Sequence, residues 1–321
     1  MMPAEIISES EFIAIFEAHG GGETAKRLGM SPRDVFQRRR RLEKKLLRTI
    51  VSPTASPNPS GKAFQRVASD APGRVNVEVD TGVVLVGSDA HYWPDIISTA
   101  HRAFVQFCKD LTPKIVILNG DEMDGASISR HPPIGWEKNP SVIQEIEACQ
   151  ERLGEIEAAA PKAKRFWNLG NHDARFSTRL AAVAPEYANV HGTSLKDHFP
   201  AWDPCWSVWI NDDVVVKHRF KGGIHATHNN TLWAGKTIVT GHLHSLKVTP
   251  LTDYNGTKYG VDTGCIADAF GPQFEYLEDN PRNWRSGFVV LTFYKGRLLW
   301  PDVAHVFDDG VLEFRGAVYN V

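Results

Sequence analysis

The stretch Gly82-Val83-Val84-Leu85-Val86-Gly87-Ser88-Asp89-Ala90-His91 decides the fold of most of this chain. It is a short, largely β-branched run that ends abruptly in polar residues, as a buried strand followed by a loop would. Comparable runs occupy residues 114–118, 164–168, 213–217, 236–240 and 287–293, and helix-length stretches occupy residues 96–110, 140–160 and 175–184. This alternation predicts an α/β core around a largely buried sheet. Further strand-like runs from about Lys258 onward predict additional antiparallel strands.

Polar residues follow five of these runs, where open α/β sheets place their sites. In order they are Ser88-Asp89-Ala90-His91, Gly120-Asp121-Glu122-Met123-Asp124, Gly170-Asn171-His172-Asp173, His218 and Gly241-His242-Leu243-His244. In an extended backbone residues i and i+2 point the same way, so we expect each D-x-H or H-x-H pair to converge on one region. Carboxylate, imidazole and amide donors without thiolate suit Mn, Fe, Zn or Mg rather than a soft metal. A central carboxylate such as that of Asp121 is suited to bridging two such ions.

The order of the motifs identifies a family. D-x-H, G-D-x-x-D, G-N-H-D, a strand-ending His and G-H-x-H resemble the successive motifs of calcineurin-like metallophosphoesterases. The resemblance spans Asp89 to His244, within a domain expected at about residues 82–303. It implies a four-layer αββα sandwich around two sheets and two divalent metal ions, with Mn expected first and Fe, Zn or Mg as alternatives.

The resemblance also implies roles for individual residues. One ion would be held by Asp89, His91, Asp121 and His244, and the other by Asp121, Asn171, His218 and His242. His172 would contact the phosphate and protonate the leaving oxygen, and Asp173 would orient it by accepting a ring N–H. Asp124 closes the second motif but is usually not a ligand in the family.

The fourth motif leaves an alternative open. His218 is preferred because it ends the run Val214–Val216, yet Arg219 follows it where the family usually has Gly or His. His225 and His228 lie close by in a Gly-rich stretch. Either of them could be the ligand instead, could contact substrate, or could cap the helix that follows.

The loop of residues 126–139 follows the second motif and is expected to overhang the metals. Within it, Arg130 and His131 are candidate phosphate contacts, and Trp136 is a candidate stacking surface for a base. The alternative is a proline-ordered loop that packs on the body.

The first 50 residues form a basic head. Residues 26–48 hold ten Lys plus Arg and two Asp plus Glu, whereas residues 67–321 hold 24 and 31. Ser8 with Glu11 predicts a capped helix that Gly20-Gly21-Gly22 ends, a short helix follows to Gly29, and Ser31-Pro32 begins a third helix to about Ile50. The segment ETAKRLGMSPRDVFQRRRRLEKKL resembles the helix-turn-helix of small bacterial and phage DNA-binding domains. We therefore expect DNA as a partner.

A Pro- and Ser-rich segment separates the head from the body. The domains expected are a helix-turn-helix-like head at residues 1–50, a linker at 51–81 and a metallophosphoesterase domain at 82–321. The acidic start MMPAEIISESEF and the lack of an apolar run of about 18 residues predict an intracellular protein with no membrane partner. Cys108, Cys149, Cys205 and Cys265 form no C-x-x-C pair, which favours free thiols over a disulfide framework.

These features lead to one main hypothesis of function. It is a two-metal phosphodiesterase or nuclease that acts on DNA through attack by metal-bound hydroxide, and its head and body together resemble a phage gene product of a bacterial host. A first alternative is a phosphatase or nucleotide phosphodiesterase whose head serves localisation or assembly. A second is a DNA-binding or scaffold protein with a vestigial site.

Overall fold

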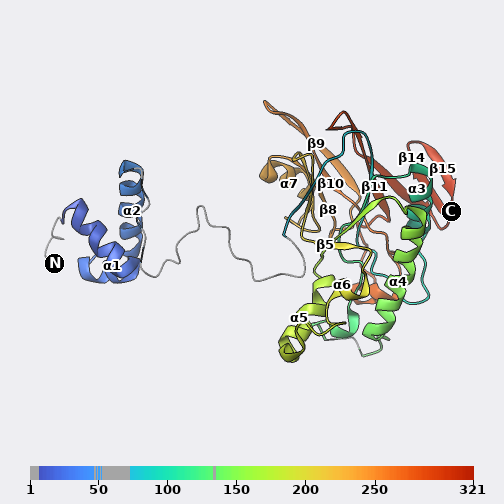
Figure 1. The fold of residues 1–321 in the computed structure, drawn as a ribbon, viewed down its shortest axis with the longest axis horizontal. Helices are drawn as coiled ribbons and strands as arrows, with labels where there is room; N and C mark the ends of the chain where they lie inside the picture. The colour runs from blue at the N-terminus through green and yellow to red at the C-terminus, as the bar shows by residue number, and fades with distance from the viewer. Residues whose placement is uncertain (1–6, 47, 49, 51, 53–72, 133–134) are drawn as a thin grey trace. The chain divides into compact units, whose positions relative to one another are not determined.

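The computed structural model describes residues 7–46, 48, 50, 52, 73–132 and 135–321. The chain divides into two compact units, Met1–Ala68 and Ser69–Val321, and each is described by itself (Figure 1). Most of the predicted linker, residues 51 and 53–72, lies outside the described residues.

The head contains α1 (Glu9–Leu28) and α2 (Pro32–Leu46). Ser8 caps α1 as predicted: its Oγ accepts the Glu11 N–H at 3.2 Å, and the Glu11 carboxylate accepts the Ser8 N–H at 3.0 Å. Apolar side chains from both helices form a separate small core around Phe12, Phe16 and Leu42. The head therefore has an interior of its own.

Glycines divide α1 and end it. Gly20 leaves helical geometry at φ 72° and kinks the helix, while residues 21–28 continue it. The prediction that all three glycines end the helix is therefore wrong, because only the first one breaks it. Gly29 ends α1 in the left-handed conformation at φ 60°, and the Ser31 hydroxyl accepts the Asp34 N–H at 3.2 Å where α2 begins.

Two sheets form the body. The smaller contains β1 (Val75–Val77), β6 (Val208–Ile210), β7 (Val214–Val216), β8 (Thr237–Thr240), β10 (Gly256–Asp262) and β9 (Lys247–Asp253), in that order. The larger contains β15 (Ala317–Asn320), β14 (Val311–Phe314), β13 (Asp302–Asp308), β11 (Gly287–Tyr294), β2 (Gly82–Gly87), β3 (Ile115–Leu118), β4 (Lys164–Asn168) and β5 (Asp203–Cys205), with β12 (Arg297–Leu298) beside β11. Strands β2 to β5 run parallel, and β11 to β15 pair antiparallel, as predicted for the end of the chain.

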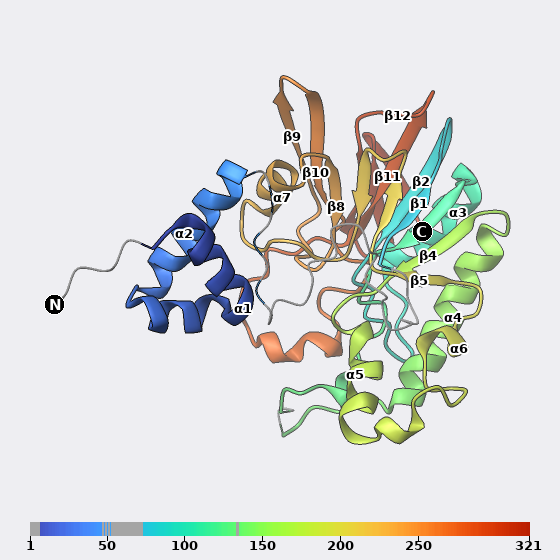
Figure 2. The same ribbon diagram turned by 60° about the vertical axis from the view of Figure 1, so that its left-hand side comes forward.

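Successive side chains of a strand point to opposite faces of its sheet, so each strand contributes to two core layers. Leu85 joins the core shared with α3 (Thr99–Leu111) and α4 (Val142–Ala159), whereas Val84 and Val86 join the core between the two sheets. On the far side, α7 (Ala226–Ala234) packs on β8, β9 and β10 (Figure 2). The order helices, sheet, sheet, helix confirms the predicted four-layer α/β fold.

Five further helical elements lie in the described part of the body. They are η1 (Ala126–Ile128), α5 (Asp173–Val183), η2 (Pro185–Tyr187), α6 (Leu195–His198) and η3 (Pro272–Leu277). Strand β1 falls inside the range predicted as linker, yet Val75, Asn76 and Val77 pair in parallel with β6. Residues 75–77 thus belong to the smaller sheet. No helix among the described residues has the length and apolar character needed to cross a membrane.

Candidate metal centre

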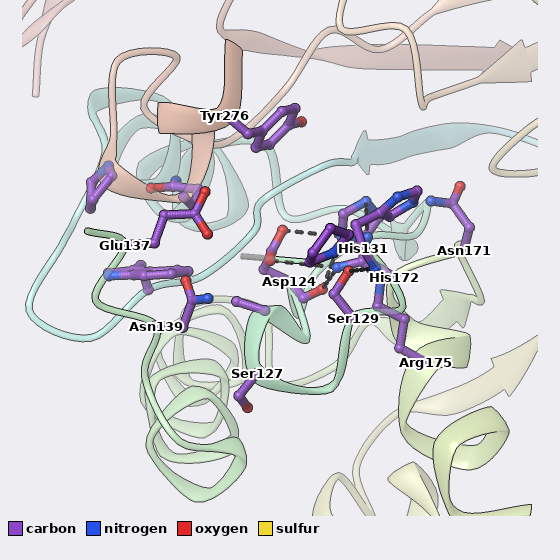
Figure 3. A pocket seen from close by; sticks show the side chains of 15 residues that line it. Asp124, Ser127, Ser129, His131, Glu137, Asn139, Asn171, His172, Arg175 and Tyr276 are labelled. Carbon is purple, nitrogen blue, oxygen red and sulfur yellow. Dashed lines mark hydrogen bonds and ion pairs between the residues drawn. The ribbon is translucent and has the colours of Figure 1, made fainter. Parts of the chain in front are cut away.

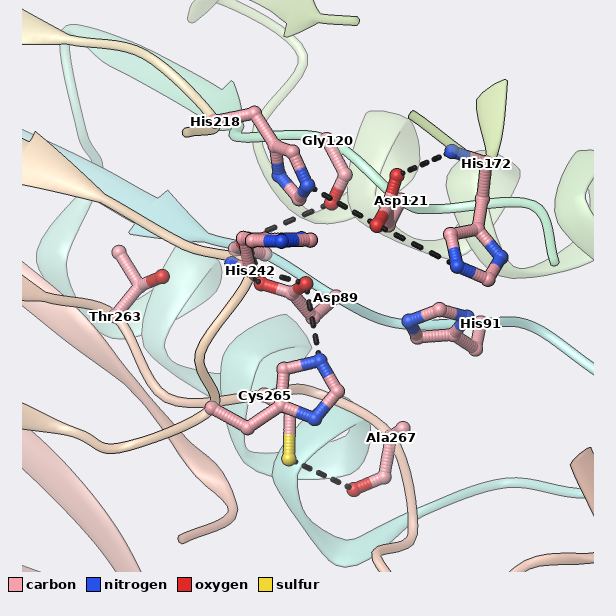
Figure 4. A network of polar contacts seen from close by, with 12 residues as sticks. Asp89, His91, Gly120, Asp121, His172, His218, His242, Thr263, Cys265 and Ala267 are labelled. Atoms are coloured by element: carbon pink, nitrogen blue, oxygen red, sulfur yellow. Dashed lines mark hydrogen bonds and ion pairs between the residues drawn. The ribbon is translucent and has the colours of Figure 1, made fainter. Parts of the chain in front are cut away.

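The predicted ligands lie together where strands of both sheets end (Figure 4). Strands β2, β3 and β4 of the larger sheet lead to Asp89 and His91, to Asp121, and to Asn171 and His172. Strands β7 and β8 of the smaller sheet lead to His218 and to His242 and His244. The site therefore joins the edges of two sheets across the core that separates them.

The backbone turns sharply at most of these ligands. Asp89, His91, Asp121, His242 and His244 have φ angles of 55°, 41°, 56°, 72° and 56°. The expectation that each i, i+2 pair converges because its backbone is extended is therefore wrong. A left-handed residue other than glycine costs about 1–2 kcal/mol, so surrounding contacts must hold these turns.

Two motif glycines allow the loops to approach each other. A Cβ on Gly170 would lie 2.0 Å from Oδ1 of Asp121, and one on Gly241 would lie 2.5 Å from Oδ2 of Asp89. Neither distance leaves room for a methyl group. These glycines are required by the close approach of a carboxylate, and neither has a positive φ.

A first cluster contains Asp89, His91 and His244, whose ligand atoms lie within 4.8 Å of one another. His244 Nε2 lies 3.0 Å from Asp89 Oδ1, and the backbone N–H of His242 donates to the same carboxylate at 2.8 Å. Nδ1 of His91 lies 2.8 Å from Asp124 Oδ1, which leaves Nε2 as the ligand nitrogen of His91.

A second cluster contains Asp121, His218 and His242. His218 Nε2 lies 3.0 Å from Asp121 Oδ2, and its Nδ1 is fixed at 2.7 Å from the carbonyl oxygen of Asn119. Asn171 Oδ1 is buried and has no hydrogen-bond partner in the described part of the chain, as a ligand oxygen would be. His225 and His228 are exposed and belong to neither cluster, so the geometry favours His218 in the fourth motif.

The electrostatics of the site favour positive charge beside its carboxylates. Burial alone would lower the pKa of His218, but Asp89 and Asp121 outweigh it and raise that pKa to about 9. Burial lowers the pKa of His91, and burial together with His218 lowers that of His242. Those two imidazoles are therefore held in the neutral form that binds metals.

Asp124, rather than Asp173, orients His172. The Nδ1 atom of His172 lies 2.9 Å from the Asp124 carbonyl oxygen and 3.0 Å from Asp124 Oδ1. Burial would lower the pKa of His172, but Asp124 and Asp121 outweigh it and place the pKa above its ordinary value. The prediction that Asp173 orients His172 is therefore wrong, since the Asp173 carboxylate points elsewhere.

Asp173 instead holds the loops together. Its two oxygens accept the backbone N–H groups of Asp121, Glu122, Met123 and Gly170 and the indole N–H of Trp167, at 2.8 to 3.2 Å. One buried carboxylate thus fixes the turns after β3 and β4. Asp173 positions the ligands and does not touch the ring of His172.

Sequence reasoning missed two more positioning residues. Asp262 ends β10, and its Oδ1 accepts the N–H groups of Ser245, Leu246 and Gly264, which fixes the loop after His244. Arg175 donates to the Asp124 carbonyl oxygen at 2.9 Å, and its Nη2 lies 3.3 Å from Nε2 of His172. A signal for Asp262 existed, because it too is an acidic residue at the end of a strand.

A cavity of about 530 Å³ opens beside the clusters (Figure 3). Asn171, His172 and Arg175 lie at one end of it, and Glu137 and Asn139 lie at the other. His131 lines this cavity, whereas Arg130 is exposed and is not among the lining residues. Seven described residues between Ala126 and Asn139 therefore line the cavity.

The donors fit divalent metal ions. Both clusters combine one carboxylate with two imidazoles, and the amide oxygen of Asn171 adds a further hard donor. The four cysteines are buried free thiols and belong to neither cluster. Such oxygen and nitrogen sets bind Mn, Fe, Zn or Mg.

No family model and no curated protein matches the sequence. Among solved structures, Vps29 of Chaetomium thermophilum is 10% identical with a TM-score of 0.39, and the alignment covers 74% of this chain and 98% of that one. Yfce, a phosphoesterase from E. coli, is 15% identical with a TM-score of 0.33, covering 74% and 99%. A dimetal phosphatase from Danio rerio is 10% identical with a TM-score of 0.32, covering 75% and 99%.

The family resemblance rests on the chain itself. The five motifs occur in family order, the body has the four layers that the resemblance implies, and the motif residues assemble into ligand clusters that include those around Asp89 and Asp121. In sequence motifs, fold and candidate metal centre, this chain resembles the calcineurin-like metallophosphoesterases.

Proposed function

We propose that this chain is a metal-dependent phosphoester hydrolase and that its substrate is a phosphodiester in DNA, as for a nuclease or end-processing enzyme. The proposal of hydrolase activity rests on the ligand clusters that contain Asp89 and Asp121. Two divalent ions held there would polarise a phosphoryl group and activate water. We expect Mn²⁺ to support the reaction.

The residues beside the clusters supply the remaining chemistry. Asp124 holds Nδ1 of His172, so Nε2 is the nitrogen left to protonate the leaving oxygen. The raised pKa of His172 favours the protonated form that this step needs. The Arg175 guanidinium lies beside Nε2 on the cavity wall, where it can bind phosphoryl oxygens.

The choice of DNA rests on the head. Arg33, Arg40, Arg41 and Lys44 of α2, here called the α2 basic stripe, are exposed and make no hydrogen bond or ion pair within the described residues. Arg40, Arg41 and Lys44 lie seven, eight and eleven residues after Arg33, and this spacing places all four on one side of a helix. The other basic residues of α2 are engaged within the head, as when Arg38 donates to the Ile7 carbonyl oxygen at 2.7 Å. A one-sided, unpaired cationic stripe suits a phosphate backbone.

A second candidate function is hydrolysis of a small phosphoester. It is favoured by the cavity of about 530 Å³, which lies in the size range of small-ligand sites. In that case the α2 basic stripe would serve localisation or assembly.

The test compares substrates on one metal-loaded protein. We would measure hydrolysis of bis-p-nitrophenyl phosphate, p-nitrophenyl phosphate and labelled single- and double-stranded DNA with Mn²⁺, using His172→Ala as the blank. DNA cleavage that falls sharply when Arg40→Glu and Lys44→Glu are combined would support the nuclease. Turnover of small esters with intact DNA would instead support the second candidate, and loss of all turnover with bound metal would contradict both.

A further inference from the structure

Positive charge on the body is concentrated in the stretch of sequence that contains the ligands His218, His242 and His244. Residues 214–252 contain Lys217, Arg219, Lys221, Lys236 and Lys247 but no Asp or Glu. The rest of residues 67–321 holds 19 Lys plus Arg (24 − 5) and 31 Asp plus Glu. A stretch of this length without Asp or Glu in an acidic body is a local electrostatic feature, and the proposed hydrolysis at the metal centre does not explain it.

The same stretch exposes large apolar side chains. Residues 219–225, which connect the ligand His218 to α7, are all exposed. Ile224 is 77% exposed, and on α7 Trp233 is 68% exposed. We call Arg219, Phe220, Lys221, Ile224, Leu232 and Trp233 the loop–α7 surface.

Internal contacts hold this surface in place. Lys221 Nζ lies 3.5 Å from the centroid of the Trp233 ring, and the Lys221 N–H donates to Asn230 Oδ1 at 3.0 Å. Lys247 Nζ donates to the Ile224 carbonyl oxygen at 3.3 Å. The loop is thus fastened to α7 and to β9 while its aromatic and cationic groups face outward.

The loop end of this surface borders the site. Arg219 follows His218 directly, and Lys247 lies three residues after His244. In Figures 1 and 2, α7 lies beside the strands β8 and β10 whose ends lead into the site. The loop after His218 therefore borders the site, and α7 runs from the end of this loop back toward the start of β8.

We propose that the loop–α7 surface binds single-stranded nucleic acid next to the metal centre. Exposed aromatic rings flanked by cations that have no carboxylate partner among the described residues are the chemistry that binds a single strand, since bases stack on the rings while phosphates meet the cations. A duplex hides its bases and would use the cations alone. The inference deepens the proposed function and rests on it for the identity of the substrate.

The experiment measures binding without turnover. The full chain carrying His172→Ala, with Arg40→Glu and Lys44→Glu to remove the head's contribution, is titrated against fluorescein-labelled oligo-dT by fluorescence anisotropy. Into this background we introduce Trp233→Ala or Lys221→Glu. Matched controls outside the loop–α7 surface are Phe307→Ala in β13, an aromatic residue 76% exposed, and Lys109→Glu on α3. Thermal melting and bound-metal content check that each variant is folded.

Trp233→Ala is expected to weaken oligo-dT binding by about tenfold, as expected for one lost stacking contact. Lys221→Glu is expected to reduce the slope of log K against log salt by about 0.7, the value for one phosphate contact of a single strand. Both controls should bind as the background does. Equal oligo-dT affinity in Trp233→Ala and Phe307→Ala would overturn the proposal. The proposal would also be overturned if Trp233→Ala weakened the binding of a Glu-rich peptide or a blunt duplex as much as it weakens the binding of oligo-dT.

The outcome separates this inference from the proposed function. If oligo-dT binding depends on Trp233 but the wild type hydrolyses only small esters, the loop–α7 surface binds single-stranded nucleic acid and the nuclease proposal is rejected. If the wild type cleaves DNA but binding does not change in Trp233→Ala or Lys221→Glu, the nuclease proposal stands and the proposal for the loop–α7 surface is rejected.

Discussion

The Oδ1 atom of Asp124 lies 3.0 Å from Nδ1 of His172, and the same oxygen lies 2.8 Å from Nδ1 of His91. One carboxylate therefore orients both a ligand imidazole and the imidazole that we assign to proton transfer. Because Asp124 raises the pKa of His172 against the effect of burial, its loss should change both geometry and protonation.

We predict that Asp124→Asn lowers kcat by about 10- to 100-fold with metal saturating, as measured for partners that orient metal ligands. The pKa of His172 should fall because a raising charge is removed. If protonated His172 is needed, the alkaline limb of the kcat profile moves to lower pH. Asp110→Asn on the exposed side of α3 is the control. An unchanged alkaline limb would contradict the assignment of His172 as proton donor.

We predict that Gly241→Ala abolishes high-affinity metal binding. The added Cβ would lie 2.5 Å from Asp89 Oδ2, so either the carboxylate or the loop must move. Isothermal titration with Mn²⁺ measures the loss. Gly154→Ala is the matched control, since a Cβ there meets nothing within 4 Å and alanine favours the interior of α4 by up to about 1 kcal/mol. Unchanged Mn²⁺ affinity in Gly241→Ala would show that the loop tolerates displacement.

We predict that Mn²⁺ stabilises the protein and that chelation reverses the effect. A ligand that binds only the folded state adds about 2.7 kcal/mol to the free energy of unfolding at 100 times its Kd. Asp121→Asn should remove most of this gain, because its carboxylate serves the second cluster and lies central to the site. Thermal melting with Mn²⁺ and with EDTA measures it. A melting temperature indifferent to metal would argue against the site.

The strands and their polar ends could be predicted because both signals are local. The runs at residues 83–87, 164–168 and 236–240 become β2, β4 and β8 almost to the residue, since buried β-branched segments have few alternatives. The ligands follow because strand ends in α/β folds lead into sites. The helix cap at Ser8 is equally local.

The remainder depends on contacts between distant segments. Periodicity identifies a strand but not its partner, so the pairing of Val75–Val77 with β6 has no sequence signal. The left-handed turns at Asp89 and His91 exist because other loops hold them, and an extended backbone was the wrong assumption. That Asp124, rather than Asp173, orients His172 depends on where each side chain points, which adjacency in sequence does not determine.

We predict a pH dependence of stability from Glu145. This residue of α4 is fully buried and accepts the N–H of Ala126 at 3.0 Å, and burial raises its pKa from the ordinary value of 4.5 to about 7. A raised folded-state pKa means that the stabilisation is present below pH 4.5 and is lost as pH rises through about 7. Relative to Glu145→Gln, the unfolding free energy of the wild type should fall by up to about 3 kcal/mol across this window, at about 1.4 kcal/mol per pH unit.

Urea unfolding at pH 4.5 and pH 8 measures the difference for Glu145. Glu147→Gln, an exposed position on the same helix, is the control and should follow the wild type. A wild type and Glu145→Gln with parallel pH profiles would show that Glu145 stays ionised in the folded protein.

We predict that the basic residues of α2 separate into two functional groups. Arg40→Glu combined with Lys44→Glu should weaken DNA binding and lower the salt slope by about 1.8, the value for two phosphate contacts on duplex DNA, without unfolding the head. Arg38→Ala should instead destabilise the head, because Arg38 donates to the Ile7 carbonyl oxygen and its guanidinium lies 4.7 Å from the Phe12 ring centroid. Anisotropy with a labelled duplex at several salt concentrations tests the first effect, with the double reversal Lys109→Glu and Lys162→Glu on the body as the charge-matched control. Equal affinity of the two double variants would remove the argument for DNA as the substrate, because it would show that net charge, rather than the α2 basic stripe, governs binding.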